Sequence, residues 1–108
     1  MEELIQKAME AREKAYAPYS GFMVGAALQC ADGTVYTGCN IENAAYGSTM
    51  CAERNAIANM ITNGENGICR LIAVDRNGKA IPPCGACREF MVQLMPDHYH
   101  SIQIMMDY

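Results

Sequence analysis

An Asp32-Gly33 pair in the first third of the chain limits the fold more than any other feature. The pair is among the strongest short-range signals of a β-hairpin, and it separates two strand-like runs, residues 22–30 and 35–42. Two strands joined by so short a turn pair antiparallel. The sequence therefore predicts a sheet that begins with a hairpin.

Helical and strand patterns alternate around this hairpin. Before it, Leu4, Ala8, Ala11 and Ala15 keep helical spacing, and Pro18 follows the end of that helix. After it, the patterns predict a helix, a strand, a helix and a strand over residues 51–62, 69–75, 85–95 and 101–106. We expect a loop over 76–83, because the two prolines at its end are incompatible with a helix.

This order of elements predicts an α/β fold with three layers, α/β/α, in which helices cover both faces of a mixed sheet. The later strand-helix-strand unit should be a right-handed parallel crossover. Strand 69–75 is mostly apolar, so we expect it to be buried on both faces. In helix 51–62, Ala56, Ile57, Met60 and Ile61 should share one buried face.

Length and charge limit the partners of the chain. Its 108 residues fit a single domain, 1–108, and an apolar content of 51% suffices for a packed core. A net charge of −4 repels phosphate backbones, which disfavours a nucleic-acid ligand and favours a small neutral one. No apolar run approaches the roughly 20 residues of a membrane span, and the N-terminus lacks an apolar signal core. We therefore expect a cytoplasmic protein that does not enter membranes.

The chain contains six cysteines, at positions 30, 39, 51, 69, 84 and 87. Their even number suggests a disulfide framework, but such a framework needs an oxidising compartment and no export signal is visible. The remaining alternatives are small buried apolar residues, a redox pair and metal ligands. We expect Cys30, Cys39 and Cys69, which lie in the predicted strands, to be buried.

The other three cysteines lie at predicted helix starts, Cys51 in one helix and Cys84 and Cys87 in the next. Three thiolates on one zinc ion leave a fourth tetrahedral position open for water, as a catalytic zinc site requires. Glu53 follows Cys51 by two positions, so it can reach that water without binding the metal and can transfer its proton. The alternative is that Glu53 only complements the helix dipole in the first turn.

Two arginines lie beside these cysteines. We expect Arg54 to donate a hydrogen bond to a cysteine sulfur and Arg88 to be solvated.

Four segments in this order carry a family resemblance: "AYAPYSGFMVGAAL", "GCNIENAAYG", "CAERNAI" and "PCGACRE". Through them nearly the whole chain resembles the cytidine deaminases of the small, three-cysteine, homotetrameric type, and it fits the pattern of zinc deaminases. The resemblance implies one Zn²⁺ per chain, held by Cys51, Cys84 and Cys87, with Glu53 as the proton shuttle.

The resemblance also implies the residues that contact a nucleoside, in chain order Phe22, Asn40, Glu42, Ala44, Tyr46 and Ala52. Asn40 and Glu42 would bond the ribose hydroxyls, Phe22 would pack beside the pyrimidine, and the backbone at Ala52 would contact the base. Ala44 and Tyr46 would reach the ribose pocket of a neighbouring subunit. The alternatives are turn chemistry for Asn40 and Glu42 and an ordinary core position for Phe22.

Members of this family usually continue with a further strand and a short helix beyond a last strand such as 101–106. Because this chain ends at Tyr108, we expect that strand to lie at an uncovered sheet edge and the pocket to be more open. We expect a homotetramer, with a homodimer as the second choice.

The predicted activity is that of a hydrolase, which deaminates cytidine and deoxycytidine to the uridines with release of ammonia, in pyrimidine salvage. An alternative is deamination of a modified cytidine or of a cytosine-nucleoside antibiotic such as blasticidin S, although "CNIEN" favours an ordinary ribose. Alternatives of other classes are a zinc-binding module without catalysis and a redox protein that uses Cys84 and Cys87.

Overall fold

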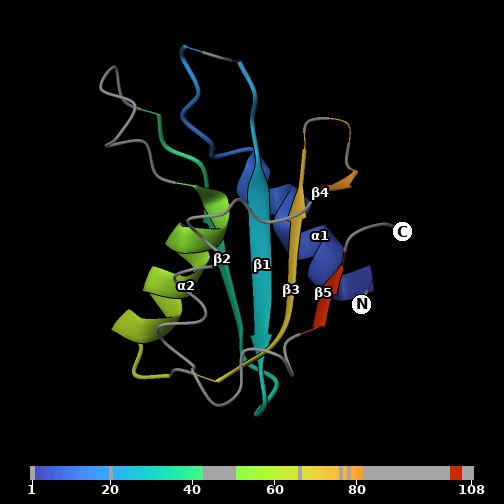
Figure 1. Ribbon diagram of the computed structural model, residues 1–108, viewed down its shortest axis with the longest axis vertical. Coiled ribbons are helices and arrows are strands. Elements are labelled where there is room, and N and C mark those ends of the chain that lie inside the picture. The colour runs from blue at the N-terminus through green and yellow to red at the C-terminus, as the bar shows by residue number, and fades with distance from the viewer. Residues whose placement is uncertain are drawn as a thin grey trace.

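The computed structural model describes residues 2–19, 21–42, 51–65, 67–75, 77, 79–81 and 103–105. Their elements, in chain order, are α1 (Glu2–Arg12), β1 (Gly25–Cys30), β2 (Val35–Cys39), α2 (Ala52–Thr62), β3 (Ile68–Val74), β4 (Ala80–Ile81) and β5 (Gln103–Met105) (Figure 1). Neither described helix is long and apolar enough to cross a membrane. The predicted helix over 85–95 lies outside the described residues.

The sheet has the order β2-β1-β3-β4, with β5 paired to β3 (Figure 1). β1 is antiparallel to both of its neighbours, and β4 is antiparallel to β3. β5 runs parallel to β3 through residues 70–72, next to the stretch that pairs with β4. The predicted mixed sheet and its parallel pair are confirmed.

The hairpin forms where the sequence predicts it. Gly25 to Gln29 pair with Cys39 to Val35, and Gly33 takes the positive φ of 91° that glycine accepts readily. The Asp32 carboxylate accepts a hydrogen bond of 2.9 Å from the Thr34 N–H, which closes the turn. Both strands are shorter than predicted at the end away from the turn, where Asn40 bonds through its side chain to Val24 and Phe22 and through its carbonyl to Tyr16.

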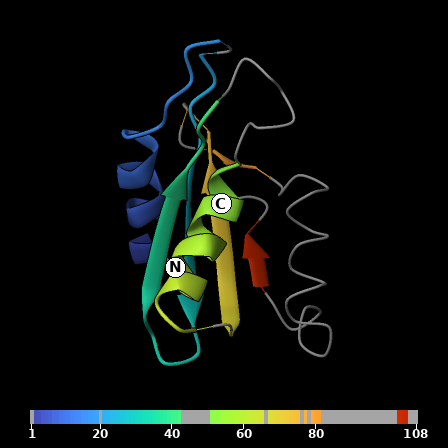
Figure 2. The same cartoon turned by 90° about the vertical axis from the view of Figure 1, so that its left-hand side faces the viewer.

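α1 and α2 cover opposite faces of the sheet, as the three-layer prediction requires (Figure 2). On the α2 face the core contains Leu28, Ile57, Met60 and Leu71, among others. On the α1 face it contains Leu4, Ala8, Ala27, Ile72 and Val74. Residues 71–74 of β3 contribute alternately to the two cores, so the prediction that this strand is buried on both faces is confirmed for that stretch.

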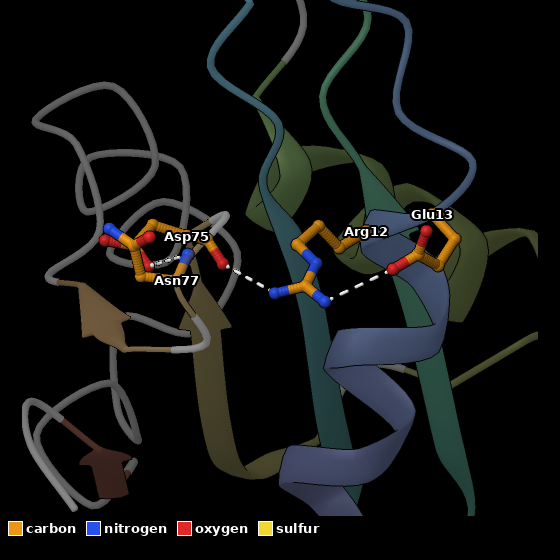
Figure 3. A network of polar contacts seen from close by, with 4 residues as sticks. All are labelled: Arg12, Glu13, Asp75 and Asn77. Atoms are coloured by element: carbon orange, nitrogen blue, oxygen red, sulfur yellow. Dashed lines mark hydrogen bonds and ion pairs between the residues drawn. The ribbon is translucent and has the colours of Figure 1, made fainter.

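One short strand was not predicted. Asp75 folds the chain back on itself, because its carboxylate accepts hydrogen bonds from the N–H groups of Asn77 and Lys79, at 2.9 and 3.0 Å. Arg12 at the end of α1 donates to the Asp75 carbonyl at 2.9 Å (Figure 3). Part of the expected loop 76–83 therefore pairs with β3 as β4, and two residues are too few to show a strand period.

Three further expectations are wrong in detail. Ala15 lies beyond α1, which ends at Arg12. Ile61 is 40% exposed, because it lies at the edge of the buried face, about 40° around the helix from Ile57 on the side away from Met60. Cys69 is exposed, because the register passes from Gln29↔Arg70 to Cys30↔Ile68 and leaves it unpaired in a β-bulge.

The other two strand cysteines are closer to prediction. Cys30 is buried, and this burial is the main reason that its pKa rises to about 11. Cys39 is half-buried, and burial also raises its pKa.

Candidate active site

The first turn of α2 places two of the predicted site residues together. Cys51 has an extended backbone, with φ −74° and ψ 151°, and is the N-cap of the helix. Its carbonyl accepts the first helical hydrogen bond, from the Asn55 N–H at 3.1 Å. A helix N-terminus carries partial positive charge, which favours an anionic thiolate and an anionic carboxylate there. Cys51 therefore lies where a metal-binding thiolate is stabilised.

Glu53 is buried in that first turn, with 4% of its surface exposed. A carboxylate that only complements a helix dipole gains nothing from leaving water, and its burial is costly. Burial beside Cys51, which is a predicted metal ligand, is an environment in which general acids and bases are found. The burial of Glu53 is compatible both with proton transfer and with a purely structural contact.

Asn40, just past the end of β2, is buried and bonds to the segment in front of β1. Its Oδ1 accepts from the Val24 N–H and its Nδ2 donates to the Phe22 carbonyl, both at 2.9 Å. The turn-chemistry alternative therefore describes part of its role. The amide keeps one N–H and one lone pair in addition, which leaves capacity for a ligand.

Glu42 holds the neighbouring loop in a similar way. Its N–H donates to the Tyr16 carbonyl at 2.8 Å, and its Oε1 accepts from the Tyr19 N–H at 3.0 Å. Tyr16 also forms a parallel bridge with Ile41. Asn40 and Glu42 thus have structural contacts that the sequence did not reveal, since these contacts depend on a segment some twenty positions away.

Phe22 is 46% exposed, so its alternative assignment as an ordinary core residue is wrong. Three other large apolar side chains at this end of the sheet are also exposed, those of Tyr16, Tyr19 and Ile41. The loops that carry them lie at the end of the sheet where β1 begins, β2 finishes and α2 starts (Figure 1). An exposed apolar surface beside a buried carboxylate is typical of a ligand or subunit contact.

The other predicted site residues are placed only in part. Ala52 is buried and Arg54 is half-buried, both in the first turn of α2. Ala44, Tyr46, Cys84 and Cys87 lie outside the described residues, and so does Arg88. A cavity of about 420 Å³ lies between α1 and β2, but none of the predicted site residues lines it.

Two residues near Cys51 and Glu53 were not predicted. Asn55 donates from Nδ2 to the Cys39 carbonyl at 2.6 Å, and Gly38 lies directly beneath the first turn of α2. A glycine inside a strand is the one sequence signal of such a close approach.

A soft thiol donor at a helix start, beside a buried carboxylate, is compatible with part of a catalytic zinc site, although the described residues include no group of three or more possible metal ligands. The fold and this pair of residues are those expected of a zinc-dependent hydrolase. The family model of the cytidine and deoxycytidylate deaminase zinc-binding region matches residues 1–101.

Individual relatives agree with this match. The cytidine deaminase of Halalkalibacterium halodurans is 50% identical over 93 residues, which cover 86% of this chain and 70% of that protein. The cytidine deaminase of Mycobacterium tuberculosis is 42% identical over 96 residues, which cover 84% and 72%. The crystal structure of the Mycobacterium leprae cytidine deaminase superposes with a TM-score of 0.90 at 37% identity, over 97% of this chain and 86% of that one. The chain belongs to the cytidine and deoxycytidylate deaminase family.

Proposed function

We propose that this protein catalyses the hydrolytic deamination of cytidine and deoxycytidine to uridine and deoxyuridine, with release of ammonia. The family match over residues 1–101 carries this conclusion, and the burial of Glu53 next to Cys51 agrees with it. The reaction replaces the amino group at C4 of the base by oxygen, so it needs an activated water and a group that moves protons.

One Zn²⁺ per chain is held by Cys51, Cys84 and Cys87. When bound, the metal supplies the Lewis acidity that activates a water for attack on the base. Arg54, half-buried in the same turn as Cys51, donates to a cysteine sulfur and offsets the charge of three thiolates.

Glu53 acts as general base and then as general acid. It accepts a proton from the attacking water, delivers it to N3 of the pyrimidine, and assists the departure of ammonia from C4. Its burial keeps bulk water away and holds the carboxylate in one place, which proton transfer over hydrogen-bond distance requires.

The nucleoside lies against the end of the sheet that carries Asn40 and Glu42. Both side chains are fixed by hydrogen bonds to neighbouring backbone, so they offer pre-oriented partners to the ribose hydroxyls. The exposed face of Phe22 packs beside the pyrimidine, and the backbone at Ala52 contacts the base.

Residues 1–108 form one domain, and the active protein is a homotetramer, with a homodimer as the second choice. Ala44 and Tyr46 reach the ribose pocket of a neighbouring subunit. The exposed side chains of Tyr16, Tyr19 and Ile41 support such an interface, because apolar surface of this kind is usually covered. Deamination of free nucleosides in the cytoplasm places the protein in pyrimidine salvage.

An absorbance assay with cytidine, deoxycytidine, cytosine and blasticidin S, run beside a zinc determination, tests the activity. We expect about one zinc per chain and turnover of the two nucleosides. Zinc-loaded protein that is inactive on both nucleosides would overturn the proposal. Turnover of blasticidin S alone would assign the activity to the antibiotic, and protein without zinc would support a redox pair.

Glu42→Ala tests ribose recognition. A site built to bond a sugar hydroxyl loses most on the substrate that carries it, so this variant should impair cytidine far more than cytosine. Equal loss on both substrates would indicate a folding defect.

Light scattering of diluted protein tests the assembly. Activity should fall as the oligomer dissociates, and a fully active monomer would contradict the shared site.

A further inference from the structure

A short hydrogen bond joins α2 to β2 near the first turn of the helix. Asn55 Nδ2 donates to the Cys39 carbonyl at 2.6 Å, in a partly buried position. The backbone N–H of the same residue donates to the Cys51 carbonyl at 3.1 Å. Asn55 therefore closes the turn that carries Cys51 and Glu53, and it also ties that turn to the end of a strand.

The Cys39 carbonyl is available because, among the described strands, β2 pairs with β1 alone and is the first strand in the sheet order. Thr34 and Asn40, at its two ends, bond to the β1 side, through Cys30 and Val24. In an antiparallel pair, residues whose backbone N–H and C=O bond to the neighbouring strand alternate with residues whose N–H and C=O point away from that strand. Thr37 and Cys39 thus direct their carbonyls to the open side, where α2 supplies side-chain donors.

Gly38 lets the helix come close enough for this bond. A Cβ at position 38 would overlap the Ala56 nitrogen and would lie 2.6 Å from the Ala52 oxygen and 2.8 Å from the Asn55 carbonyl carbon. All three atoms belong to the α2 backbone, so no rotamer change relieves the contact. The first turn of α2 is therefore seated directly on the β2 backbone.

We propose that Asn55 is a positioning residue, which fixes the first turn of α2 against the Cys39 carbonyl over Gly38 and thereby sets the places of Cys51 and Glu53. The inference rests on the roles proposed above for those two residues. Asn55 itself touches no reacting atom. It acts because a displacement of about 1 Å in a catalytic group can cost about 100-fold in rate.

The chain offers a matched control one turn further along the same helix. Asn59 Nδ2 lies 3.5 Å from the Thr37 carbonyl, in an exposed position, so its bond to β2 is weaker and further from Cys51. Asn55 and Asn59 are the same residue type, in the same helix, and face the same strand. Loss of either bond can lower stability, by less at Asn59, whereas an effect on zinc release and on kcat is expected only at Asn55.

The experiment compares Asn55→Ala, Asn55→Asp and Asn59→Ala. Asn55→Asp keeps the shape of the side chain but removes the donor, and it should fold, because a carboxylate is favourable near a helix start. Four properties are measured for each variant. They are thermal unfolding, release of zinc to a chromogenic chelator, the absorption spectrum of the cobalt-substituted protein, and steady-state rates on cytidine.

Both Asn55 variants should lower kcat about 10- to 100-fold with a smaller change in KM, speed the release of zinc and alter the thiolate-to-cobalt absorption. Asn59→Ala should leave kcat, KM and the rate of zinc release within about twofold of the unmodified protein, and the cobalt spectrum unchanged.

Two results would overturn the inference. In the first, both Asn55 variants have a lowered melting temperature but unaltered zinc release, cobalt spectrum and kcat. Asn55 would then contribute to stability only. The other is an equal effect of Asn55→Ala and Asn59→Ala on zinc release. If the unmodified protein binds zinc but does not deaminate cytidine, the proposed function fails. Zinc release and the cobalt spectrum would still show whether Asn55 positions the first turn of α2.

Discussion

α1 and α2 both pack closely on the sheet over a glycine, but with different results. Each lies over a glycine whose Cβ would overlap helix backbone, Gly25 beneath α1 and Gly38 beneath α2. Among the described residues, the α1 contact is otherwise apolar, apart from the bond of Arg12 to Asp75. The α2 contact adds Asn55 and buries Glu53. In the proposed mechanism, close packing of the helix serves stability on one face, and both stability and chemistry on the other.

The largest effect should come from Glu53→Gln. The amide has nearly the same shape but cannot accept and return a proton, and general acid–base catalysis contributes about 10²- to 10⁴-fold. Zinc content and the melting temperature should stay near those of the unmodified protein. Wild-type turnover by zinc-replete Glu53→Gln would remove the catalytic assignment and with it the difference between the two faces.

The next largest effect is expected as a difference between two cysteine variants. Cys51→Ala removes a predicted ligand, so it should release zinc and destabilise the domain, because metal binding is coupled to folding. Cys30→Ala, in the core on the same face, should keep its zinc and cost about 1 kcal/mol of stability, as single substitutions typically do. Zinc analysis with thermal unfolding checks both, and zinc loss from Cys30→Ala alone would show that the ligand set is wrong.

The two glycines test the comparison directly. Gly25→Ala and Gly38→Ala should each cost about 1–3 kcal/mol of stability, since a methyl group is forced against helix backbone. Only Gly38→Ala should also reduce kcat, by about tenfold or more, because it moves the turn that carries Cys51 and Glu53. Rates per folded molecule separate the two effects, and an equal loss of kcat at both positions would contradict a division of roles between the faces.

The smallest effect concerns the cysteines at the opposite end of the sheet. At pH 8, a thiol reagent should label exposed Cys69 quickly and buried Cys30 slowly, in protein that keeps its zinc. Because burial raises the pKa of Cys30 to about 11, its reactive thiolate is scarce until the pH approaches that value. Mass spectrometry of the labelled peptides gives the order, and faster labelling of Cys30 would show that the α2 face opens readily.

The sequence predicts the parts of the fold that depend on neighbouring residues. Asp32-Gly33 correctly placed the hairpin, and the pattern from Cys51 onward correctly placed the start of α2. β4 and the bulge at Cys69 were missed, because both depend on how distant segments align in the sheet.

The site was predicted in the same uneven way. The burial of Glu53 agrees with the role inferred from its spacing to Cys51. The contacts of Asn40 and Asn55 were not foreseen, because an amide side chain has no sequence pattern that identifies which backbone carbonyl it will meet.

The central and outer strands are held by different contacts, and this difference determines where the protein opens locally. β1 has a backbone partner on each side and a helix over each face, so its amide hydrogens should exchange with solvent only when the whole domain unfolds. β2 is held on its outer side by asparagine side chains, and it can open locally at a lower free energy. Each such opening withdraws the Cys39 carbonyl from Asn55. On heating, the protein should therefore lose its activity reversibly at temperatures where the centre of the sheet is still intact.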